Sequence, residues 1–83
     1  MTIRDFITET ENTLMEEYDS IIAFGYAIDV NSIEVRCFST NVADLAIIKN
    51  KYFSTDNGAM ILEDTDPNSG TFGMHYLLAM KKF

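Results

Sequence analysis

The stretch 64–70, DTDPNSG, has oxygen-bearing side chains at alternate positions, which is the spacing found in calcium-binding loops. Such a loop also needs Gly at its sixth position and Glu at its twelfth, where this chain has Ser69 and His75. Pro67 departs further from the pattern. These residue types favour turns, so the sequence predicts a hairpin connection here and no metal site.

Cys37 and His75 are the single cysteine and the single histidine of the chain. A thiol and an imidazole can act as nucleophile and base, but only where folding brings them together, which sequence spacing does not show. The plainer interpretation is a small buried cysteine and a strand histidine on the less bulky face. No glycine pattern for phosphate binding is present. We therefore predict a protein that is not an enzyme, with no catalytic residues, cofactor or metal.

Acidic residues are concentrated near the N-terminus. The net charge is −7, and residues 1–34 contain eight acids and one base, whereas residues 35–83 contain five of each. This segregation disfavours nucleic acid or an anionic membrane as direct partner, because both are bound through Lys and Arg. It favours a basic protein partner, on which the carboxylates imitate DNA or RNA phosphates. The alternative is a solvated helix face that serves solubility.

The carboxylates of the first 19 residues and two nearby tyrosines form the predicted partner-binding surface, in which the aromatic rings act as anchors. Its members are Asp5, Glu9, Glu11, Glu16, Glu17, Asp19, Tyr18 and Tyr26. Glu16 and Glu17 oppose the negative end of a helix dipole, so we expect them to serve a purpose other than helix stability.

The elements that position these residues follow from apolar periodicity. Helices are predicted over 3–18 and 42–53, and strands over 21–29, 32–38, 58–64 and 71–81. Thr2 with Asp5, and Asn41 with Asp44, have the spacing of helix-capping pairs. The expected fold is a single α+β domain covering residues 1–83, in which two helices cover one face of a four-stranded, mainly antiparallel sheet.

The order α-β-β-α-β-β consists of two αββ units. DVNS at 29–32 recurs as DPNS at 66–69, an offset of 37 that also relates the two helices. A true duplication and a coincidence of turn residues are both open interpretations.

Two strands have one bulky and one flatter face. In 21–28 the bulky residues are Ile22, Phe24, Tyr26 and Ile28, and in 71–81 they are Phe72, Met74, Tyr76, Leu78 and Met80. We expect the bulky faces to lie under the helices, with Phe24 and Tyr76 in the core beside Leu14 and Ile48. The open face would then carry Ile21, Ala23, Ala27, Leu77 and Ala79, flattened by Gly25 and Gly73, and invite a second copy or a partner.

Length and composition bound the remaining possibilities. Eighty-three residues with a hydrophobic fraction of 47% suit one folded domain. The longest apolar run is far shorter than the roughly 20 residues that span a bilayer, and early charged residues interrupt any signal peptide. A lone cysteine favours a reducing, cytoplasmic location. We also predict a homodimer, formed through the open sheet face or an edge strand.

In length, acidity and α+β order, the chain resembles small acidic inhibitors made by phages and mobile elements, such as the anti-CRISPR proteins and uracil-DNA glycosylase inhibitor. It is also similar in size and charge to bacterial immunity proteins. The resemblance includes no residue motif, so it implies a functional class and no site residues. We expect an inhibitor of a nucleic-acid-handling protein that binds through its acidic surface. The alternative is a small homo-oligomeric ligand-binding or adaptor domain that uses an exposed sheet face.

Overall fold

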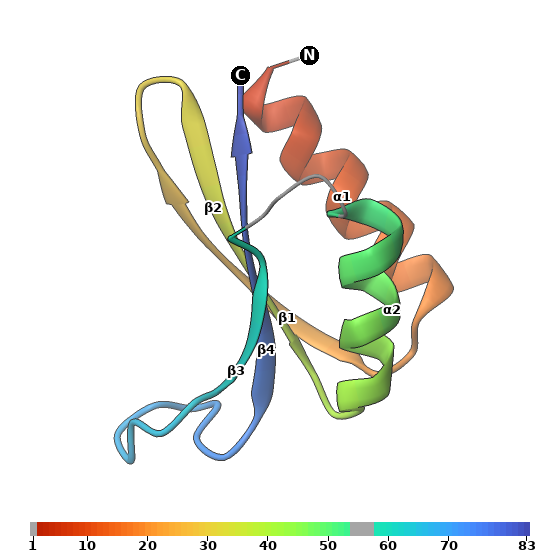
Figure 1. Cartoon of the computed structure of the whole chain (residues 1–83), viewed down its shortest axis with the longest axis vertical. Helices are drawn as coiled ribbons and strands as arrows, with labels where there is room; N and C mark the ends of the chain where they lie inside the picture. Colours follow the sequence, from red (N-terminus) through yellow and green to blue (C-terminus); the bar gives the residue numbers. More distant parts are fainter. Residues whose placement is uncertain (1, 54–57) are drawn as a thin grey trace.

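The computed structural model describes residues 2–53 and 58–83. Within these residues the chain forms two helices and a four-stranded antiparallel sheet, which confirms the predicted α+β fold class (Figure 1). The elements are α1 (Ile3–Glu17), β1 (Ile21–Ile28), β2 (Ser32–Ser39), α2 (Val42–Tyr52), β3 (Met60–Glu63) and β4 (His75–Lys82).

The strand order is β1-β2-β4-β3, and every neighbouring pair is antiparallel. Each αββ unit therefore contributes its second strand to the centre of the sheet. Both helices lie on the same face of the sheet, α1 against β1 and α2 against β4, β2 and β3 (Figure 1). Among residues 2–53 and 58–83, no helix lies on the opposite face of the sheet.

The first residues of α1 form the predicted capping box. The Asp5 backbone N–H donates to Thr2 Oγ1 at 3.1 Å, and the Thr2 backbone N–H donates to an Asp5 carboxylate oxygen at 3.4 Å. These bonds satisfy backbone donors that have no partner within the helix. One member of the predicted acidic surface, Asp5, therefore also has a structural role.

The start of α2 differs from the sequence prediction in one detail. Asn41 caps the helix as predicted, since its side chain accepts a bond from the Ala43 N–H at 3.0 Å. Asp44 is not its capping partner, because the Asp44 carboxylate accepts the Ser20 hydroxyl at 2.6 Å. The Ser39 hydroxyl donates in turn to Ser20 Oγ at 2.7 Å. A tertiary bond therefore replaces the predicted local one and ties α2 to the beginning of β1.

The core lies between the helices and the sheet. Leu14 from α1 and Leu45 and Ile48 from α2 are 0–1% exposed, which confirms the prediction for Leu14 and Ile48. Phe24 is half-buried and packs against this core, as predicted. Buried side chains of this kind supply most of the free energy that stabilises a small domain.

The prediction for the two faces of β4 is wrong. Leu77 and Ala79 are buried beneath the helices, whereas Tyr76 lies on the open face. The cause is the register with β2, in which Cys37 is opposite Leu77 and Arg36 is opposite Leu78. Opposed residues share a face, so burying the bulky side of β4 would also bury the Arg36 charge, at a large cost in desolvation.

A β-bulge near the start of β1 makes a second prediction wrong, namely that Ile22 lies under the helices and Ile21 lies on the open face. The pairing shifts between Ile21 and Ala23, so that Ile21 lies opposite Ser39 and Ala23 lies opposite Phe38. Ile21 consequently enters the core at 6% exposure, while Ile22 is left 48% exposed. The extra residue changes the side on which every earlier residue lies, and period-two reasoning cannot include it.

The β3–β4 connection is the predicted hairpin turn, although β4 begins at His75 and not at residue 71. Gly73 has a φ of 84°, a left-handed conformation that favours glycine and ends the turn. Asp64 accepts the hydroxyls of Ser69 and Thr71 at 2.7 and 2.5 Å, together with the Asp66 N–H. These bonds lower the pKa of Asp64.

Candidate functional site: an acidic helix face and an open sheet face

Three predicted carboxylates lie on the outer side of α1, where Glu9 also borders the cleft between the two helices. Asp5, Glu9 and Glu16 are exposed and recur at helical spacing, so they extend over about 16 Å of helix. In the part of the chain that the structure describes, the side chains of Glu9 and Glu16 form no ion pair and no hydrogen bond. Asp19, which follows the helix, is also exposed and unpaired there. These carboxylates remain available to a partner.

Glu17 is engaged within the fold. Its carboxylate accepts the Tyr52 hydroxyl at 2.8 Å and pairs with Lys51 Nζ at 3.2 Å, joining the last turn of α1 to the last turn of α2. The Tyr52 bond, followed by the contributions of Lys51, lowers the pKa of Glu17. This contact is the other purpose expected for Glu17, whose position opposes the helix dipole.

Glu11 and the two predicted tyrosine anchors lie on the inner side of α1. Tyr26 points from β1 toward the helix layer, and its hydroxyl oxygen is buried near Glu11 without a hydrogen bond of good geometry. Burial, followed by the Glu11 charge, raises the pKa of Tyr26. Tyr18 is half-buried and packs against the core. The structure therefore separates both rings from the outer acidic face and leaves Asp5, Glu9 and Glu16 as its members on α1.

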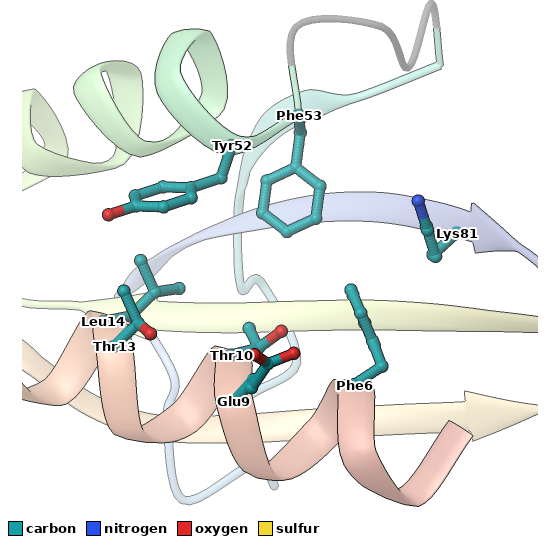
Figure 2. Close-up of a pocket in the computed structure, with 8 residues that line it drawn as sticks. All are labelled: Phe6, Glu9, Thr10, Thr13, Leu14, Tyr52, Phe53 and Lys81. Carbon is teal, nitrogen blue, oxygen red and sulfur yellow. The ribbon is translucent and has the colours of Figure 1, made fainter. Parts of the chain in front are cut away.

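A cleft of about 300 Å³ separates the two helices above the end of β4. Figure 2 shows the rings of Phe6 and Phe53 projecting into it from opposite sides, with Tyr52 beside them and Lys81 at one end. Its other lining residues are Glu9, Thr10, Thr13 and Leu14. Apolar rings dominate the walls, and the polar groups do not converge on one point as acid–base chemistry would require.

The open sheet face has a flat half and a bulky half. The flat half consists of Ala23, Gly25 and Ala27 on β1, and the bulky half consists of Phe38, Tyr76, Leu78, Met80, Met60 and Leu62 on β2, β4 and β3. Phe38 and Tyr76 contact each other with ring centroids 5.0 Å apart. The Arg36 guanidinium lies 5.7 Å from the Tyr76 ring centroid, within reach of a cation–π contact.

Sequence reasoning missed the bulky half of this face. The signal that identifies it is the alternation of Glu34, Arg36 and Phe38 with buried neighbours along β2. Because β4 pairs with β2, Leu78 and Met80 lie opposite Arg36 and Glu34, and these charged residues must stay on the open side. The bulky residues of β4 therefore face the open side as well.

Cys37 and His75 lie on adjacent strands, because Cys37 is opposite Leu77 and Ser39 is opposite His75. They are therefore diagonal neighbours on the helix-covered face. Cys37 is 1% exposed, and burial raises the pKa of its thiol to about 12. A nucleophilic cysteine needs the opposite shift, so this pair is unsuited to thiolate chemistry at neutral pH.

Comparison with known proteins finds no matching family model, no matching curated protein and no matching solved structure. Across residues 2–53 and 58–83, no helix is long and apolar enough to cross a membrane. Within the same residues, no three His, Cys, Asp or Glu side chains are grouped so as to hold a metal ion.

Proposed function

We propose that this chain is a non-enzymatic binding protein that docks the outer face of α1 on a basic surface of a nucleic-acid-handling protein and inhibits it. The observation that supports the proposal is the row of exposed carboxylates on α1, of which Glu9 and Glu16 have no partner within the described residues. Unpaired charges of one sign on a rigid helix retain their full attraction for an oppositely charged surface.

The mechanism of inhibition is occupation of the partner's nucleic-acid site. A site that binds nucleic acid presents Lys and Arg to a line of phosphates, and a helix with carboxylates over about 16 Å is complementary to it. Charge attraction accelerates the encounter, and the carboxylate positions select the partner. Such a protein belongs with the anti-CRISPR, anti-defence and immunity-protein class of phages and mobile elements and acts in the cytoplasm. Burial of Cys37 raises the pKa of its thiol and disfavours a thiolate nucleophile at this position.

A charge-reversal pair tests the proposal. The test variant combines Glu9→Lys with Glu16→Lys. The matched control combines Asp29→Lys with Glu63→Lys, of which Asp29 is exposed just after β1 and Glu63 is exposed at the end of β3. Each pair changes the net charge from −7 to −3, because each reversal adds two charges. Tagged wild type and both variants capture proteins from host lysate at low and high salt, and the captured protein is then titrated with each of them.

We expect the wild type to capture a basic protein at low salt and to release it as salt rises. The Glu9/Glu16 variant should bind it at least about tenfold more weakly, mainly through slower association, while the control variant remains close to wild type. Equal, salt-insensitive binding by the wild type and the Glu9/Glu16 variant would contradict the proposal. The open sheet face supports a second candidate, a self-associating adaptor.

A further inference from the structure

We infer that the open sheet face binds the open sheet face of a second copy of this chain, forming a weak symmetric dimer. The inference does not depend on the proposed function, because the acidic face of α1 lies on the opposite side of the molecule. It starts from the large apolar side chains that the sheet leaves without a helix, such as Met60 and Met80, which are 45% and 48% exposed.

Gly25 in the flat half has no explanation within the monomer. Among the described residues only Gly73 has a positive φ, so the backbone at position 25 does not require glycine. A Cβ built on Gly25 would lie 3.7 Å from the Arg36 Cβ, an ordinary contact. Glycine in a strand interior weakens the strand and is typical of a site where another chain approaches closely.

The two halves of the face complement each other in shape. A twofold axis parallel to the strands, lying between the two facing sheets, would place the bulky half of one copy over the flat half of the other, which is the arrangement an isologous interface requires. Because the strand order is β1-β2-β4-β3, Ala23, Gly25 and Ala27 on β1 then lie opposite β3 of the other copy and provide space for Met60 and Leu62. A different protein with a uniformly bulky face would be complementary in shape only to the flat half of this surface.

Charge also favours a second copy at this face. Arg36 and Lys82 outnumber Glu34 among the strand residues of this face, and Asp64 and Asp66 border it beside Arg36, so the face carries little net charge although the chain carries −7. Arg36 of one copy can pair with Glu34 of the other. The α1 carboxylates of the two copies would be separated by both sheets, well beyond the Debye length of about 8 Å at physiological salt.

The available area suits weak association. Three strands of eight residues and one of four cover about 450 Å², from typical strand spacing and rise. Two copies would bury roughly 900 Å², close to the approximately 1,000 Å² that separates specific interfaces from casual contacts. We therefore expect a dimer that forms in the micromolar range and dissociates on dilution.

Sedimentation equilibrium over a range of concentrations, at low and high salt, tests the inference. Gly25→Gln fills the flat half, and its matched control Gly70→Gln makes the same change in the turn, where a Cβ has nothing within 4 Å. Met80→Lys places a charge on the bulky half, and its matched control is Met15→Lys on α1, where Met15 is 54% exposed. Thermal melts confirm that each variant folds.

The wild type and both controls should dimerise, more weakly at about 0.01 M salt than at high salt, because the Debye length of about 30 Å at that low salt lets the two acidic chains repel each other. Gly25→Gln and Met80→Lys should each weaken the dimer by about tenfold or more. A wild type that stays monomeric at every concentration and salt would overturn the inference. A dimer that survives both variants would do so too, because it would use another surface such as the edge of β1. The expected salt effect is opposite to that of a basic partner, so the two proposals can fail independently.

Discussion

Glu17 shows how a single carboxylate can belong to a charged segment and still be unavailable to a partner. The side chain of its neighbour Glu16 has the same chemistry but forms no hydrogen bond or ion pair within the described residues, whereas the Glu17 side chain links α1 to Lys51 and Tyr52. The difference arises because adjacent helix residues point about 100° apart. Glu17 therefore contributes to the stability of the helix pair, and Glu16 contributes to the field of the outer face.

Glu17→Gln should make the free energy of unfolding fall less steeply as the pH is lowered. The folded-state pKa of Glu17 lies below its ordinary value of 4.5, so its contribution is complete above that pH and is lost as pH falls through the folded-state pKa. Urea melts of wild type and variant should therefore differ most near neutral pH and converge in acid. Glu16→Gln is the control, and it should retain the wild-type acid dependence. Parallel curves for wild type and Glu17→Gln would show that the contact does not stabilise the fold.

At the scale of elements, the neighbouring strand β2, and not the residue sizes within β4, determines which face of β4 is buried. Its larger residues lie on the open face because β2 places Glu34 and Arg36 there. The two strands therefore act as a unit in which the charged strand determines the orientation of the apolar one. The same unit produces the open face and its bulky half.

A pair of leucine substitutions on β4 tests this orientation. Leu77 is 1% exposed beneath the helices, and Leu78 is half-buried on the open face. Leu77→Ala should lower the free energy of unfolding by about 3 kcal/mol, because it leaves a cavity in the core. Leu78→Ala should cost less than about 1.5 kcal/mol, since part of its surface is already in water. Denaturant melts at low protein concentration measure both, and equal losses would contradict the assigned faces.

At the scale of the whole molecule, the acidic row on α1 and the open sheet face lie on opposite sides. Exposed carboxylates such as Glu9 and Glu16 lie on the helix layer, and Met60 and Met80 lie on the open face, although exposed apolar side chains such as Met15 and Ile47 also lie on the helices. This separation lets the protein carry two surfaces with opposite responses to salt. One surface would bind more weakly as salt rises, and the other would bind more tightly.

The acidic face should also make thermal stability dependent on salt. Asp5 and Glu9 are about 6 Å apart along the helix axis, within the Debye length, and they repel each other in the folded state. Added sodium chloride should raise the melting temperature of the wild type by a few degrees. The Glu9→Lys and Glu16→Lys variant should show a smaller rise, because it replaces repulsion with attraction on the same face. A wild-type melting temperature that falls with salt would contradict this expectation.

The sequence by itself determined the elements, their order, the caps Thr2 and Asn41, and the fold class. These features depend on interactions between residues a few positions apart, which periodicity and residue type record directly. It also determined the acidic character of α1, because charge is a property of composition.

Only the tertiary structure decided which side of β4 is buried, where the bulge of β1 reverses the facing of Ile21 and Ile22, and which carboxylates remain free. Each depends on a partner distant in sequence, as when Asp44 bonds Ser20 or Glu17 bonds Tyr52. A period of two gives the faces of a strand but not which of them meets the helices, since that choice is made by the neighbouring strand.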